Sequence, residues 1–180
     1  RGTHNLYNTL AAVAISAAAR FSLAAIYGGI VAFQGRPHRL EFVRDWGGAA
    51  WYNDSIATSP ERAIAALDSF DEPIVLLAGG RDKDLPWETF GERIQQKVDH
   101  LVLFGEVADL VAKAVGDVQP GARPFTIDRC EGLEQAVKKA AELVEPGDVV
   151  LLSPGGTSFD EFSDFEERGK RFRQWVKELT

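Results

Sequence analysis

The fold is indicated most directly by residues 149–169, which read Val149-Val-Leu-Leu-Ser-Pro-Gly-Gly-Thr-Ser158-Phe-Asp-Glu-Phe-Ser-Asp-Phe-Glu-Glu-Arg-Gly169. The apolar run at residues 149–152 is typical of a strand buried on both faces of a parallel sheet. We expect a long helix to follow at residues 160–179. Residues 153–158 would then present backbone N–H groups and hydroxyls beside a helix N-terminus, where an anion can bind. An ordinary turn between a strand and a helix explains the same residues equally well.

Upstream of this strand, the sequence alternates between expected helices and strands. We expect further strands at residues 74–78, 100–104 and 125–127, and helices at residues 60–67, 86–96, 107–115 and 133–144. Residues 39–44 and 50–54 alternate in polarity around Gly47-Gly48, which predicts a hairpin. The whole pattern predicts an α/β fold with a doubly wound, mostly parallel, Rossmann-like sheet, to which the hairpin adds one antiparallel edge strand.

The beginning of the chain has a different, helical pattern. We expect one helix from residue 5 to about residue 19 and a second at residues 22–33. The first helix carries alanine on most of its faces, which predicts close packing against another element.

Composition limits the kinds of partner. The 180 residues carry a net charge of −7, with 45% hydrophobic and 26% charged residues, as in an ordinary globular protein. This charge argues against nucleic-acid or anionic-membrane partners, although a few local cations can still bind an anionic substrate. The longest apolar stretch, residues 10–19, is too short to span a bilayer, so the cytoplasm is the expected location. Cys130 is the only cysteine, which excludes an internal disulfide and gives no metal site; we expect a partly buried thiol.

Polar and glycine-rich residues follow several of the expected strands. Because ligands bind beyond the carboxyl ends of the strands in such sheets, these residues predict a ligand-binding rim. Glycine after a strand can also be simple turn chemistry. The residues are Asp54-Ser55, Gly79-Gly80-Arg81-Asp82-Lys83, Gly105-Glu106 and Ser153-Pro154.

Three collinear motifs resemble the bacterial Mur ligases, especially their D-glutamate-adding members. The first is the stretch 153–169 quoted above. The second is Gly35-Arg-Pro-His-Arg-Leu-Glu41 followed by Trp51-Tyr-Asn-Asp-Ser-Ile-Ala-Thr-Ser-Pro60, and the third is His4-Asn-Leu-Tyr-Asn8. Their order and spacing fit from end to end, so the resemblance covers essentially the whole chain.

The resemblance implies two parts. Residues 1–34 correspond to the last helices of a central ATPase domain, and residues 35–180 to the C-terminal domain that binds the acceptor amino acid. The sequence contains no Gly-x-x-x-x-Gly-Lys-[Ser/Thr] loop, which the family keeps in its central domain. It also begins at Arg1 and contains no methionine. We therefore expect this chain to be a C-terminal piece of a longer, monomeric enzyme. The piece itself is expected to hold no catalytic residue and to be inactive alone.

The implied reaction joins D-glutamate to UDP-N-acetylmuramoyl-L-alanine in peptidoglycan synthesis. ATP would phosphorylate the carboxylate of the nucleotide sugar, and the amine of D-glutamate would attack the resulting acyl phosphate. Mg²⁺ would neutralise the phosphates. Its protein ligands are expected upstream of this chain, which is expected to swing and close the site.

The resemblance assigns residues to each ligand. For ATP these are Asn5, Asn8, His38, Arg39 and Asp54, of which Asn5 and Asn8 lie one helical turn apart on the same face. Taken without the resemblance, His38 is better explained as a structural histidine and Asp54 as a cap. The guanidinium of Arg39 suits phosphate or ribose oxygens.

For D-glutamate, the implied set combines one ammonium with neutral donors. A dicarboxylate needs such a set, because both carboxylates must be held without crowding the attacking amine. The residues are Thr58, Lys83 and Ser158, with backbone contacts from Phe159 and Phe165. Lys83 can also be explained as a solvated loop lysine.

Ile56 is a departure from the family pattern, which usually has a lysine at this position. The turn Gly155-Gly156-Thr157 is also looser than in the family. A related ligase therefore remains possible, either for another acidic amino acid or resembling folylpolyglutamate synthase. A non-catalytic nucleotide-binding module is the other alternative, and the His4–Asn8 motif counts against it.

Overall fold

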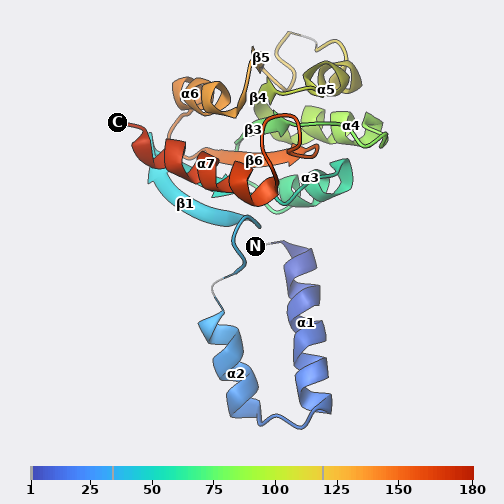
Figure 1. Cartoon of the computed structure of the whole chain (residues 1–180), viewed down its shortest axis with the longest axis vertical. Coiled ribbons are helices and arrows are strands. Elements are labelled where there is room, and N and C mark those ends of the chain that lie inside the picture. Colours follow the sequence, from blue (N-terminus) through green and yellow to red (C-terminus); the bar gives the residue numbers. More distant parts are fainter. Residues whose placement is uncertain (1, 34, 119) are drawn as a thin grey trace.

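The computed structural model describes residues 2–33, 35–118 and 120–180 and shows a helical hairpin next to an α/β unit (Figure 1). The hairpin consists of α1 (Thr3–Ala18) and α2 (Leu23–Ala32). The side chain of Ser22 caps α2 by accepting a hydrogen bond from the backbone N–H of Ala25. Both helices lie where the sequence predicts them, and together they project away from the sheet.

One six-stranded sheet forms the centre of the α/β unit. Its order is β1-β2-β6-β3-β4-β5, and among the strands of the described ranges only β1 and β2 pair antiparallel. This confirms the predicted fold class. The strands are β1 (Glu41–Trp46), β2 (Ala49–Asn53), β3 (Ile74–Gly79), β4 (Val98–Phe104), β5 (Thr126–Cys130) and β6 (Val149–Gly155). Gly47 and Gly48 both have positive φ, the conformation that a two-residue hairpin turn requires.

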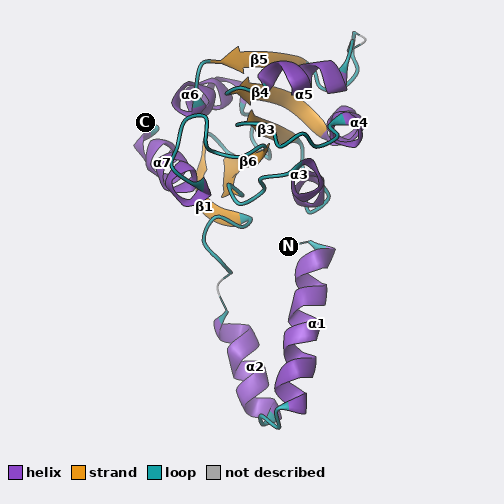
Figure 2. Ribbon diagram, turned by 45° about the vertical axis from the view of Figure 1, so that its right-hand side comes forward, coloured by secondary structure: helices purple, strands orange, loops and turns teal. Residues whose placement is uncertain are grey.

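Helices cover both faces of this sheet (Figure 2). On one face lie α3 (Pro60–Leu67), α4 (Glu88–Lys97) and α5 (Ala108–Val115); on the other lie α6 (Leu133–Leu143) and α7 (Phe165–Glu178). Because strand side chains alternate between faces, Leu76 of β3 packs in the first core, and Val75 and Leu77 pack in the second. The continuous apolar runs of the sequence reflect this burial on both sides.

The segment after β6 differs from the prediction. The strand continues to Gly155, and α7 begins at Phe165 rather than at residue 160. Asp164 caps α7 by accepting from the backbone N–H of Glu167, whose carboxylate accepts from both the N–H and the hydroxyl of Ser163. The prediction that residues 153–158 lie beside a helix N-terminus is therefore wrong, since the helix starts seven residues after Ser158 and its first turn is already capped.

The predicted partial burial of Cys130 is confirmed. This burial raises the pKa of its thiol. Several boundaries shift by one to three residues: β1 begins at Glu41, β4 begins at Val98, β5 ends at Cys130 and α4 begins at Glu88. No helix in the described ranges is long and apolar enough to cross a membrane.

Candidate functional site

The loops after β3 and β6 form one continuous surface. The N–H of Arg81 donates to the carbonyl of Thr157 at 2.9 Å, and the N–H of Thr157 donates back to the carbonyl of Arg81 at 2.8 Å. Gly80 permits this approach: it has a φ of +103°, and a Cβ at this position would lie 2.1 Å from the Thr157 carbonyl oxygen. Lys83 and Ser158 are therefore placed on neighbouring loops.

The loop after β4 is tied to the same surface. Arg81 donates two hydrogen bonds of 2.8 Å to the carboxylate of Glu106, and this pairing lowers the pKa of Glu106. The N–H of Glu106 in turn donates to Asp160. Both partners of the ion pair are exposed, so the pair fixes the position of the loop after β4 more than it stabilises the fold.

The buried side chain of Arg168 links the loops after β2 and β6 from inside the protein. Its guanidinium is fully buried and donates to the hydroxyl and carbonyl of Ser55 and to the carbonyls of Gly156 and Thr157, at 2.9–3.1 Å. Desolvation lowers the pKa of Arg168 to about 10, and the more distant charges of Asp160 and Glu161 oppose this shift. The arginine is therefore a charged centre inside the rim.

Asp54 is a second buried charge of this region. Its carboxylate accepts from the N–H of Leu40 at 3.1 Å and from the hydroxyl of Ser153 at 3.0 Å. Burial nevertheless raises the pKa of Asp54 to about 7, although these hydrogen bonds and the charges of Arg39 and Arg62 pull it down. The carboxyl thus holds residues 38–40 against the end of β6.

His38 is placed inside the protein rather than facing a ligand. Its Nδ1 lies 3.0 Å from the side-chain amide nitrogen of Asn53, and the residue is 4% exposed. A Cβ on Gly169 would lie 2.1 Å from Nδ1, so α7 packs directly on this ring. Desolvation lowers the pKa of His38, and Glu41 opposes the shift. This geometry favours the structural interpretation of His38.

The residues expected to bind D-glutamate lie on loops that the fold joins. Thr58 is half-buried, Ser158 is 2% exposed and Lys83 is exposed. The N–H of Gly155 donates to the carbonyl of Ala57, which connects the Thr58 loop to the end of β6. Phe159 is exposed at 61%. Phe165 is half-buried, and its carbonyl accepts from the hydroxyl of Ser55.

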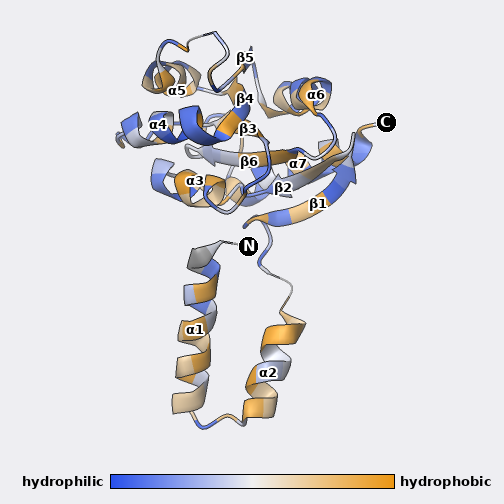
Figure 3. Ribbon diagram, turned by 180° about the vertical axis from the view of Figure 1, so that it is seen from behind, coloured by the Kyte–Doolittle hydropathy of each residue, from blue (hydrophilic) through white to orange (hydrophobic). Residues whose placement is uncertain are grey.

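A groove of about 940 Å³ lies between α1 and α2 and continues to the segment before β1. Three of the residues expected near ATP line it, namely Asn5, Asn8 and Arg39; His38 and Asp54 are not part of its lining. Arg36 adds a second cation, and none of the lining residues is acidic. Apolar residues cover much of the hairpin around it (Figure 3). The groove suits a ligand with an anionic and an apolar part.

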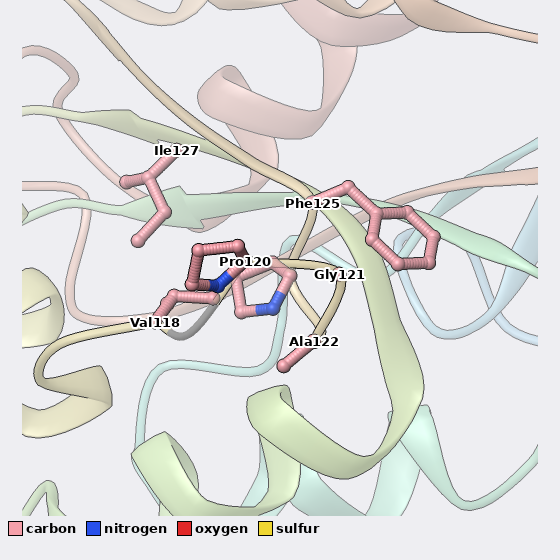
Figure 4. Close-up of a pocket in the computed structure, with 7 residues that line it drawn as sticks. Val118, Pro120, Gly121, Ala122, Phe125 and Ile127 are labelled. Carbon is pink, nitrogen blue, oxygen red and sulfur yellow. The ribbon is translucent and has the colours of Figure 1, made fainter.

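A smaller cavity of about 290 Å³ lies beside β5 and is lined by apolar residues including Val118, Phe125 and Ile127 (Figure 4). Its lining carries no charged side chain. It lies apart from the rim, and none of the residues implied by the resemblance lines it. Within the described ranges, no cluster of three or more histidine, cysteine or acidic residues is placed to hold a metal ion.

From the sequence, Arg168 was noted only as part of the motif that resembles the Mur ligases, and its burial was not predicted. A signal was present, because Arg168, Phe172 and Val176 are four residues apart and share one helix face. In the structure all three are buried. Asn53 was missed as well; its amide also reaches Glu41 and the carbonyl of Gly169.

A family comparison covers most of the α/β unit. The family model described as "Mur ligase, glutamate ligase domain" matches residues 38–156. The chain belongs to the Mur ligase family. The matched region includes the loops after β2, β3 and β4 and the first residue after β6, Gly156.

Relatives of this Mur ligase chain extend the match over its full length. The UDP-N-acetylmuramoylalanine–D-glutamate ligase of Symbiobacterium thermophilum is 43% identical over 179 residues, and that of Acetivibrio thermocellus is 42% identical over 183 residues. Each match covers 99% of this chain but only 39% of the relative. The chain therefore spans about two fifths of the length of these enzymes.

Solved structures support the fold alone. The UDP-N-acetylmuramate–alanine ligase of Thermotoga maritima superposes with a TM-score of 0.69 at 17% identity, covering 99% of this chain and 39% of that one. The folylpolyglutamate synthase of the same organism gives 0.62 at 18% identity, covering 98% and 39%. The hairpin and the α/β unit thus occur together in other ligases.

Proposed function

We propose that this chain is the acceptor-binding part of an ATP-dependent ligase that adds D-glutamate to UDP-N-acetylmuramoyl-L-alanine in the cytoplasm. Residues 35–180 form the acceptor domain, and residues 1–34 belong to the central ATPase domain. The observation that carries the proposal is the joining of three loops, which bear Thr58, Lys83 and Ser158, at the carboxyl ends of the strands. The names of the two relatives above support the choice of reaction.

The rim has the chemistry that a dicarboxylic amino acid requires. The ammonium of Lys83 attracts a carboxylate, and the hydroxyls of Thr58 and Ser158 add neutral hydrogen-bond donors. Fixing both carboxylates orients the amine toward the acyl phosphate without a protein group beside the nitrogen. These residues therefore bind and orient the acceptor; the phosphoryl transfer belongs to the rest of the enzyme.

The nucleotide side is assigned to the groove of the hairpin. Arg39 and Arg36 supply positive charge at its end near the sheet, where the phosphates of ATP are proposed to lie. Asn5 and Asn8 contribute polar groups from α1. Mg²⁺ would neutralise phosphate charge when bound. The described residues offer no cluster that fits it, so its protein ligands are proposed to lie outside this chain.

The exposed apolar surface of α2 supports the proposed domain division. No residue of α2 is buried, and Leu23 and Tyr27 are exposed at 82% and 71%. An exposed surface of this kind marks a contact with another protein surface. In this proposal, the contact is with the remainder of the ATPase domain.

The test is phosphate release by the complete enzyme, with ATP and UDP-N-acetylmuramoyl-L-alanine present and the amino acid varied. We expect turnover that depends on D-glutamate and is absent with L-glutamate or D-aspartate. Ile56 makes this panel necessary, because the site lacks the ammonium usual at that position. Turnover with a different acidic amino acid would support the related-ligase alternative, and the absence of any turnover would support a non-catalytic nucleotide-binding module.

A further inference from the structure

Arg168 is unusual among the cations of this protein. In the part of the chain that the structure describes, it is the only arginine or lysine that is buried, and it forms no ion pair there. Its guanidinium is matched instead by four neutral acceptor contacts, to the hydroxyl and carbonyl of Ser55 and the carbonyls of Gly156 and Thr157. Burying a charge without an ion-pair partner is costly, and an apolar side chain of similar volume often serves stability as well. The position therefore calls for an explanation other than stability.

The acceptors of Arg168 lie next to the residues proposed to bind the amino acid. Ser55 is three residues before Thr58, and Thr157 directly precedes Ser158. Thr157 is also bonded in both directions to Arg81, two residues before Lys83. One guanidinium thus connects, directly or through a single bridge, the three loops that carry Thr58, Lys83 and Ser158.

Docking of α7 does not need this arginine. Phe172 and Val176 are fully buried in the core against β2 and α6, and Asp164 caps the helix. The rigid planar fork of arginine instead fixes the distances between acceptors, which the single ammonium of lysine does not do.

We propose that Arg168 is a positioning residue, whose guanidinium sets the spacing of the loops that carry Thr58, Lys83 and Ser158. That these loops bind D-glutamate rests on the proposed function, whereas the positioning itself rests only on the geometry. Arg168 acts through the loops and does not touch the ligand.

Amide hydrogen exchange of the 180-residue chain, followed by NMR, tests the positioning. In Arg168→Lys, we expect exchange at residues 55–58, 81–83 and 156–159 to become at least tenfold faster relative to the amides of β3 and β4. Arg171→Lys, an exposed change on the same helix, is the matched control and should leave the profile unchanged. Acceleration by the same factor in loops and strands, or no acceleration in the loops, would overturn the proposal.

A milder variant covers the case in which Arg168→Lys does not fold. Ser55→Ala removes only the hydroxyl contact to the guanidinium Nε and the one to Phe165. Faster exchange confined to the rim loops supports the proposal, and an unchanged loop profile in this variant contradicts it.

Titration with D-glutamate tests the consequence for binding. The amide shifts of the rim loops should give a dissociation constant at least tenfold weaker in Arg168→Lys than in the wild type, with Arg171→Lys unchanged. Equal affinities in wild type and Arg168→Lys would overturn the inference. If the wild type itself failed to bind D-glutamate, the proposed function would be contradicted, while the exchange experiment would still decide the role of Arg168.

Discussion

The helical hairpin and the α/β unit differ in how far their apolar residues are buried. Every residue of β3 is buried, whereas no residue of α2 is, although α2 carries Leu23, Tyr27, Ile30 and Val31. The α/β unit has a core on each face of its sheet and is complete as a folding unit. The hairpin has an apolar surface without a core of its own. The difference indicates that the rim is held by contacts within the α/β unit, while the apolar surface of the hairpin stays uncovered.

The largest expected effect comes from a cavity in the α/β unit. Leu103→Ala removes a fully buried side chain and should lower the free energy of unfolding by about 2–5 kcal/mol. Leu23→Ala, at a position 82% exposed, is the matched change in the hairpin and should alter it by less than about 0.5 kcal/mol. Urea unfolding followed by tryptophan fluorescence measures both, since all four tryptophans lie between residues 46 and 175. Equal losses would mean that the hairpin is part of the same core.

A pH-dependent effect is expected at Asp54, where the segment before β1 meets the sheet. Because the folded-state pKa of about 7 lies above the ordinary value of 3.8 for an aspartate, the folded protein holds this proton more tightly than the unfolded chain. The resulting stability is complete below about pH 4 and is lost as the pH rises to about 7.

Asp54→Asn should remove this slope. The free energy of unfolding of the variant minus that of the wild type should be larger at pH 7.5 than at pH 4.5, by at most about 4 kcal/mol, because only the wild type loses stability over this range. The wild-type-minus-variant difference cancels the titration of other groups. A difference that is constant across this range would show that the carboxyl titrates normally.

A smaller effect is expected at Gly80, where the cost of a close backbone contact can be separated from the cost of backbone strain. Gly80 and Gly147 have nearly the same φ, +103° and +102°, but only Gly80 faces another backbone; nothing lies within 4 Å of a Cβ at Gly147. Both alanine variants incur strain, and Gly80→Ala should cost about 1–3 kcal/mol more, because its Cβ meets the Thr157 carbonyl. The comparison uses the same urea unfolding. Equal costs would mean that the loops after β3 and β6 separate easily.

Local patterns in the sequence predicted most of the fold. The apolar runs gave β3, β4 and β6, and the glycine pair at 47–48 gave the β1–β2 hairpin. The start of α7 was wrong, because the acidic residues after Ser158 fit a helix locally, while the capping contacts of Asp164 select a later start.

The candidate site was less predictable, since its connections are long-range. Thr58, Lys83 and Ser158 were named from motifs, but their loops are joined by backbone hydrogen bonds between distant segments and by Arg168, 113 residues from Ser55 in the chain. The positive φ of His38 and its packing against Gly169 likewise depend on contacts that no local pattern records.

The most direct test of the account is a crossed kinetic measurement in the complete enzyme, because the rim and the groove are assigned to different ligands. Lys83→Ala should raise the KM for D-glutamate roughly 10-fold to 100-fold through loss of a charge-assisted hydrogen bond, and leave the KM for ATP nearly unchanged. Arg39→Ala should raise the KM for ATP and leave that for D-glutamate nearly unchanged. If Lys83→Ala changed only the ATP parameters, or Arg39→Ala only those of D-glutamate, the assignment of the two regions would be contradicted.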